Sequence, residues 1–120
     1  MEQEFEKLLV EHLTQIWNER DEAVRLKVIE KIYAKDVEMY DMDEETFFGY
    51  DAINKKVSSL LGTFPPDFAI TQSIQNVSSN NVAKLEWVCG AAGAPPVVTG
   101  TDIVFFEDGK IKSFYVFVNK

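Results

Sequence analysis

The sequence predicts one α+β domain, residues 1–120, in which helices pack on one face of a curved, mainly antiparallel sheet. Residues 3–34 show the apolar spacing of helices, residues 68–118 hold four consecutive strand-like segments, and turn-forming residues separate those strands. Helices first and strands afterwards are typical of α+β proteins. At 120 residues, a single domain hides roughly two thirds of the surface that its unfolded chain exposes, enough for one core.

Three helices are expected in the first half of the chain. Apolar residues recur every three or four positions across 3–18, with acids in the first turn, which predicts an amphipathic helix. Asp21 is a typical N-cap for a second helix that ends near Ala34. Gly49 interrupts the chain before a third helix at 51–61, which Gly62 and two prolines end.

The strands are short before the third helix and long after it. Two short strands are expected at 37–41 and 46–48, and four further strands at 68–77, 82–89, 97–106 and 111–118. Residues 78–81 and 107–110 have hairpin composition, and Asp108-Gly109 supplies residues that tolerate a positive φ. A longer loop is expected at 90–96.

Charge and hydropathy exclude several classes of function. The net charge is −8, and no cluster of Lys and Arg forms a footprint for nucleic acid. The sequence shows no signal peptide and no apolar run of about 18 residues, so we expect a cytoplasmic protein without membrane contact. Hydrophobic residues make up 46% of the chain and nine are Phe, which can line a cavity as well as fill a core.

Metal and cofactor chemistry are not expected. Cys89 is the only cysteine and His12 the only histidine, so the usual zinc ligand sets cannot form. Cys89 as a nucleophile would need His12 as its base. The simpler interpretation is a small apolar filler in a strand.

Two carboxylates stand in apolar surroundings and are the candidate site. Asp102 interrupts the strand-like run 97–106, and Asp41 ends the run 37–40. A buried charged group needs a partner, so such an acid is paired, protonated or facing a cavity. Strand alternation puts Val104 on the same side as Asp102, whereas Asp41 lies at a strand end that water can reach. The alternative for Asp102 is a structural acid that accepts hydrogen bonds from a neighbouring group, and the alternative for Asp41 is a solvated acid.

The chain resembles the SnoaL-like branch of the NTF2-like (cystatin-like) superfamily from Trp17 to Val118. The residues that carry the resemblance stand in the family's order and spacing: 17–21, 32–36, Asp41, 49–53, 64–65, Trp87, 100–102 and 108–111. The resemblance implies a cone in which three helices close over a strongly bent, mixed sheet and leave an apolar pocket. It also implies homodimers that form through the outer face of the sheet.

The same resemblance suggests roles for named residues. Ketosteroid isomerase shares this fold, and by motif Asp41 corresponds to its general base and Asp102 to the acid that donates a hydrogen bond to the oxyanion. The tyrosine of that enzyme falls near His12 or Leu13, where this chain has no phenol, and an inward-facing His12 could replace it. The proline that usually follows the base is Met42, and the arginine of epoxide hydrolases has no counterpart.

We expect the pocket to hold a small hydrophobic molecule. Its expected lining consists of Leu13, Trp17, Tyr33, Trp87, Val104, Tyr115 and Phe117, although aromatic residues at such positions are more often plain core. His12 lies at the edge of the apolar stripe of the first helix, where a structural role is also open.

Two hypotheses for the function remain open at this point. The first is an acid–base enzyme, an isomerase, cyclase or hydrolase that uses Asp41, Asp102 and His12. The second is a module that binds a ligand or a partner without turnover, which the missing tyrosine favours. Fold alone does not decide between them.

Overall fold

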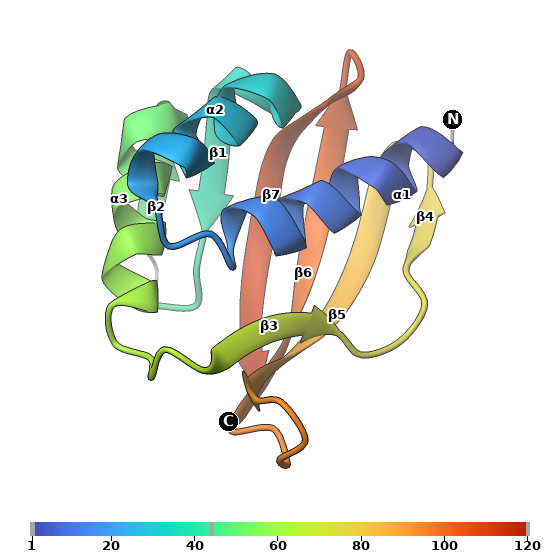
Figure 1. The fold of residues 1–120 in the computed structure, drawn as a ribbon. Helices are drawn as coiled ribbons and strands as arrows, with labels where there is room; N and C mark the ends of the chain where they lie inside the picture. The colour runs from blue at the N-terminus through green and yellow to red at the C-terminus, as the bar shows by residue number, and fades with distance from the viewer. Residues whose placement is uncertain (1, 44, 120) are drawn as a thin grey trace.

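The computed structural model describes residues 2–43 and 45–119 and confirms the α+β class. In this part of the chain the helices are α1 (Glu2–Glu11), which continues into a wide turn η1 (His12–Ile16), α2 (Glu22–Ile32) and α3 (Gly49–Leu61). The strands are β1 (Tyr33–Tyr40), β2 (Thr46–Phe48), β3 (Phe68–Gln72), β4 (Val77–Ser79), β5 (Val82–Ala91), β6 (Val98–Glu107) and β7 (Lys110–Asn119). Figure 1 shows α1 lying across one face of the sheet, with α2 and α3 together at its β1 end.

The strands form one mixed sheet in the order β2-β1-β7-β6-β5-β3, with β4 paired to β5. Only β1 and β7 run parallel among the described pairs. The central strand β6 has a neighbour on each side, so Asp102 lies opposite Leu85 of β5 and Val116 of β7. A side chain in the middle of β6 is therefore enclosed by the sheet on both sides.

The first helix widens before it ends. The backbone N–H of Trp17 donates to the carbonyl of His12 at 3.2 Å, five residues earlier, instead of the usual four. Such wide turns inside helices are frequent at functional sites. This one leaves His12, Leu13, Ile16 and Trp17 all buried, so the helix presents more side chains to the sheet than a regular turn would.

Helices α2 and α3 are joined by a buried arginine. The predicted N-cap is confirmed, because the carboxylate of Asp21 accepts from the N–H groups of Ala23 and Val24 at 3.0 and 3.1 Å. Arg25 is fully buried and donates to the Asn54 side chain at 2.5 Å and to the Ser58 hydroxyl, both on α3. This contact holds α3 against α2 and fixes where its last turn reaches the sheet.

The predicted strand at 68–77 is wrong in one respect. Strand β3 pairs with the second half of β5 and β4 with its first half, and residues 73–76 leave the strand between them. A single straight edge strand cannot pair along the whole length of the curved β5, so the pairing is divided between β3 and β4. The strand predicted at 37–41 also begins earlier, at Tyr33, because α2 ends at Ile32.

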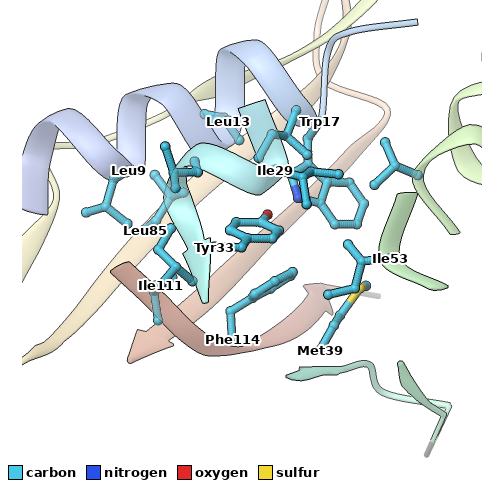
Figure 2. Packing of buried hydrophobic residues seen from close by; sticks show 14 of the residues in the cluster. Leu9, Leu13, Trp17, Ile29, Tyr33, Met39, Ile53, Leu85, Ile111 and Phe114 are labelled. Carbon is cyan, nitrogen blue, oxygen red and sulfur yellow. The ribbon is translucent and has the colours of Figure 1, made fainter. Parts of the chain in front are cut away.

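The core lies between the helices and the inner face of the sheet. Figure 2 shows Tyr33 beside Phe114, with Leu9 from α1 and Ile29 from α2 above them. Fully burying one such aliphatic side chain stabilises the fold by about 1.5–3 kcal/mol. No helix in the described ranges has both the length and the hydropathy needed to cross a bilayer.

Candidate functional site

An apolar cavity opens between the end of the first helix, α3 and the inner face of the sheet. Its volume is about 250 Å³. In residues 2–43 and 45–119, Asp102 is the only charged side chain of the lining, and Cys89 contributes a thiol whose pKa is raised by burial. The lining consists of Leu13, Trp17, Leu60, Phe64, Ile70, Trp87, Cys89, Val98, Asp102, Val116 and Val118.

The carboxylate of Asp102 is held by one donor on each oxygen. Trp87 on the neighbouring strand donates its indole N–H to Oδ1 at 3.0 Å, and Nε2 of His12 lies 3.2 Å from Oδ2. Asp102 is 4% exposed and His12 is fully buried. These contacts fix the position of the carboxylate in the wall of the cavity.

Tyr33 determines which nitrogen of His12 carries the proton. Its hydroxyl lies 2.6 Å from His12 Nδ1, and burial raises the pKa of Tyr33 well above its ordinary value, so the phenol keeps its proton. No other acceptor for that proton is present among the described residues, so Tyr33 donates to Nδ1. The proton of a neutral His12 is then on Nε2, where it is donated to Asp102.

Trp17 presents its ring to the cavity and its nitrogen to the protein interior. Figure 2 shows the indole nitrogen on the side of the ring that faces the Tyr33 hydroxyl. The nitrogen is buried and has no acceptor within hydrogen-bond range in the described structure. Trp17 therefore offers the cavity aromatic carbon.

Gly100 makes room for Trp87. It lies opposite Trp87 on β6, and a Cβ atom there would be 2.2 Å from Trp87 Cζ2 and 2.6 Å from the carbonyl oxygen of Phe117. No larger residue fits without moving the indole or the backbone. Gly100 thereby allows Trp87 to lie across β6 with its N–H on Asp102, a role that the sequence did not reveal.

Asp41 does not line the cavity. Its Oδ1 accepts from the backbone N–H groups of Asp43 and Glu45, at 3.0 and 3.2 Å, and its Oδ2 lies 3.7 Å from Lys56 Nζ. The expectation that Asp41 and Asp102 act together in one pocket is corrected on this point. Asp41 follows the last residue of β1 and organises the loop that leads to β2.

The structure sorts the other expected lining residues into three groups. Leu13, Trp17 and Trp87 line the cavity. Tyr33 and Val104 are fully buried but belong to the core, where Tyr33 contacts His12. Tyr115 and Phe117 are 38% and 46% exposed and lie on the outer face of the sheet, so their assignment to the pocket is wrong.

A β-bulge explains this last correction. Residues 105 and 106 of β6 are adjacent, but their partners in β7 are Ser113 and Ile111, which leaves Lys112 as an extra residue. The extra residue changes which positions of β7 face inward. Before the bulge the odd-numbered Ile111 faces inward, whereas beyond it the even-numbered residues Phe114, Val116 and Val118 do. Unbroken alternation from Ile111 would have put Tyr115 and Phe117 inside.

Several lining residues were not expected. Leu60 and Phe64, at the end of α3 and just after it, cover one side, and Val116 and Val118 come from the part of β7 beyond the bulge. The helical spacing of α3 gave a signal for Leu60. For the two valines, the signal was strand alternation shifted by one residue. Within residues 2–43 and 45–119, no cluster of three or more His, Cys, Asp or Glu side chains could hold a metal ion.

The fold and the site define an α+β cone that encloses an apolar pocket with one acid in its wall. A family model for the SnoaL-like domain matches residues 10–114, and the chain belongs to this family. Both the resemblance and the fold class that it implied are thereby confirmed. No curated protein sequence matches the chain.

Solved structures with the same fold span almost the whole chain. A candidate isomerase of the SnoaL-like family from Agrobacterium tumefaciens is 18% identical, with 98% of this chain and 99% of that chain covered and a TM-score of 0.87. A candidate SnoaL-like polyketide cyclase from Jannaschia is 9% identical, covering 98% and 86%, with a TM-score of 0.79. A candidate ketosteroid isomerase from Kribbella flavida is 13% identical, covering 98% and 79%, with a TM-score of 0.74. At these identities the likeness concerns the fold.

Proposed function

We propose that the protein binds a small hydrophobic molecule in the cavity and that Asp102 transfers a proton to or from it. The reaction class would be an isomerisation, cyclisation or hydrolysis of the acid–base kind. One observation carries this proposal: the Asp102 carboxylate is the only charged group that the described residues place in the apolar lining, and Trp87 and His12 hold it in place. A buried carboxylate costs several kcal/mol unless something recovers that cost, and a reacting ligand does so.

Asp102 would act as the base, with His12 and Tyr33 as positioning residues. Both carboxylate oxygens accept N–H donors, and each oxygen retains a lone pair for a proton from the ligand or from water. Asp41 is a poorer candidate, because its oxygens already serve its own loop and Lys56. In this proposal the proton transfer therefore depends on Asp102 alone.

Deuterium exchange tests the proposal without a known substrate. The protein is incubated in D₂O with a panel of small apolar compounds that carry a C–H bond next to a carbonyl, and mass spectrometry records incorporation. We expect exchange with the wild-type protein, and a drop of about 10²–10⁴-fold in Asp102→Asn, the usual contribution of a positioned base. Asp108→Asn is a matched control in an exposed turn, where φ is 52° and Asn is tolerated. Equal exchange in wild type and Asp102→Asn would refute the assignment.

A binding module without turnover is the second candidate. It is supported by the cavity lining, in which Asp102 is the only carboxylate among the described residues and the other ionisable side chain is the thiol of Cys89, whose pKa is raised by burial. In that case Asp102→Asn would still bind the neutral carbonyl compounds, and no compound would exchange in either protein.

We also propose that two copies associate through the outer face of the sheet. Tyr115 stacks on Tyr40 there, with ring centroids 4.5 Å apart, and Phe117 is exposed nearby. Exposed apolar patches of this kind mark interaction sites. Light scattering should give the mass of a dimer for the wild type and that of a monomer for Phe117→Glu; a monomeric wild type would contradict this.

A further inference from the structure

We propose that the ligand of this cavity is a compact hydrophobic organic cation, a protonated amine or quaternary ammonium group, whose charge pairs with Asp102. This inference rests on the binding part of the function proposed above and names the class of ligand. Four features of the cavity lead to it: the direction of the hydrogen bonds, the absence of a protein cation in the lining, the aromatic walls and the small volume.

The hydrogen bonds run in one direction toward Asp102. Tyr33 donates to His12 Nδ1, and His12 Nε2 then donates to Oδ2, while the indole of Trp87, which can only donate, occupies Oδ1. An aspartate that accepts on both oxygens is a carboxylate. Its remaining lone pairs repel a carbonyl oxygen or an anionic ligand and attract a cation or a donor.

No Lys or Arg of the described residues lies within ion-pair distance of Asp102 to balance this charge. Nδ1 of His12 accepts from the Tyr33 hydroxyl, and the lining contains neither Lys nor Arg among the residues that the structure describes. Within the described residues, His12 is also the only basic side chain within ion-pair distance of Asp102. A buried charge without a partner is costly, so a cationic ligand recovers more free energy here than a neutral one of equal size.

Aromatic rings face the same space. Trp17, Phe64 and Trp87 all line the cavity, and the two indoles have their nitrogens turned toward Tyr33 and Asp102. The cavity is left with ring carbons, whose π-faces attract alkylammonium groups. The Asp102 carboxylate at one end of the cavity and its aromatic walls both favour a cationic organic ligand. The net charge of −8 favours the approach of cations as well.

The volume limits the size of the ligand. The cavity holds about 250 Å³, which is less than the roughly 300–1,000 Å³ of pockets that take drug-sized molecules. A benzylamine or a small terpenoid amine fits, whereas a four-ring molecule would extend into solvent. The apolar part of the ligand would contact Leu60 and Val118, and its charged end would lie at Asp102.

Intrinsic fluorescence can measure this preference directly, because the two tryptophans of the sequence both line the cavity. The probes are four compounds with the same number of non-hydrogen atoms: benzyldimethylamine (cationic at neutral pH), isobutylbenzene, 1-phenylpropan-2-ol and phenylacetate. We expect the wild-type protein to bind benzyldimethylammonium at least about tenfold more tightly than the hydrocarbon or the alcohol, and phenylacetate most weakly. The alcohol separates hydrogen-bond donation from charge.

Variants localise the effect. Asp102→Asn should reduce the preference for the cation over isobutylbenzene to less than about threefold, whereas Asp108→Asn, which changes the net charge equally, should keep it. Phe64→Leu should weaken the cation severalfold more than the hydrocarbon. If Asp102→Asn does not fold, as judged by near-ultraviolet circular dichroism, the wild-type series and Phe64→Leu still decide. The proposal is overturned if the wild type binds isobutylbenzene or phenylacetate as tightly as the amine, or binds none of the four.

This outcome is separable from the test of the proposed function. Cation-selective binding without deuterium exchange would support this inference and leave a binding module. Exchange of neutral carbonyl compounds together with no preference for the amine would support the proton transfer and refute the cation.

Discussion

Asp102 and Asp41 occur in similar sequence surroundings, yet the fold uses them in different ways. Asp102 lies in the middle of β6, between β5 and β7, and its carboxylate accepts from Trp87 and His12. Asp41 directly follows β1, and its carboxylate accepts from the backbone of its own loop. One aspartate faces a cavity, and the other caps a turn.

The difference follows from where each residue lies along its strand. In mid-strand the neighbouring backbone N–H groups are used by the sheet, so a buried acid needs side-chain donors from other elements. At a strand end the next residues have free N–H groups, and a short acid binds them locally. An acid in the middle of a strand is therefore a better indicator of a functional pocket than an acid at a strand end.

Removing the N–H donor of His12 should lower the free energy of unfolding the most. His12→Leu leaves Asp102 with one donor and the Tyr33 hydroxyl without an acceptor, and unsatisfied buried groups cost about 1–3 kcal/mol each. We expect the free energy of unfolding in urea to fall by about 2–4 kcal/mol.

The double variant His12→Leu/Tyr33→Phe tests the cause of that loss. Without the hydroxyl, only Oδ2 of Asp102 lacks its donor, so part of the stability, about 1 kcal/mol, should return. A double variant that is less stable than His12→Leu would show that packing rather than hydrogen bonding dominates at this site.

Gly100→Ala should have the next largest effect. The new methyl group would meet both the indole of Trp87 and the backbone of β7, and such overpacking costs about 1–3 kcal/mol. The indole would move away from Asp102, so the tryptophan emission should shift as well. Gly62→Ala is a suitable control, because its Cβ would be 3.3 Å from the nearest atom and φ is −65°; its stability should change by less than about 1 kcal/mol. Equal losses in both variants would refute a special role for Gly100.

Changes at Asp41 should be milder. Asp41→Ala removes two hydrogen bonds in a loop and a partly exposed ion pair with Lys56, so we expect a loss of about 1 kcal/mol. Asp41→Asn keeps an acceptor oxygen and should lose less. Ligand affinity, followed by tryptophan fluorescence, should be unchanged in both; a tenfold loss would return Asp41 to the site.

The sequence predicted the helices, the hairpins and the inward direction of Asp102, because those depend on local spacing and on regular alternation. It did not predict the direction of Tyr115 and Phe117, because the extra residue at Lys112 reverses the alternation in β7. Bulges of this kind bend a sheet, and they depend on the curvature of the whole fold rather than on the residues beside them.

The hydrogen-bonded group around Asp102 was predictable only in part. The sequence placed His12 near the edge of the apolar stripe and Asp102 in a buried strand, but their contact joins residues 90 positions apart. The widened turn at the end of α1, which brings His12 and Trp17 inward together, has no clear signal in the apolar spacing. Gly100 is one of the residues that carry the family resemblance, yet its role becomes clear only from its close contact with the indole of Trp87.

Tyr33 and Tyr40 provide a second comparison, which concerns how the stability of the protein depends on pH. A hydrogen bond donated to Glu38 raises the pKa of Tyr40 to about 12, and burial raises the pKa of Tyr33 well above its ordinary value. Both folded-state pKa values lie above the unfolded value of about 10, so each contribution to stability is present below that pH. For Tyr40 it is lost as pH rises through about 12.

An alkaline titration followed by tyrosinate absorbance measures this difference, and it is the smallest effect expected. Tyr40 should ionise late but reversibly, and Glu38→Ala should move it toward the ordinary value because the acceptor is gone. Tyr33 should ionise only when the protein unfolds, and Tyr33→Phe should remove that step. If all four tyrosines instead titrated together near the ordinary value in the folded protein, Tyr33 would be accessible. Burial as the cause of its raised pKa would then be wrong.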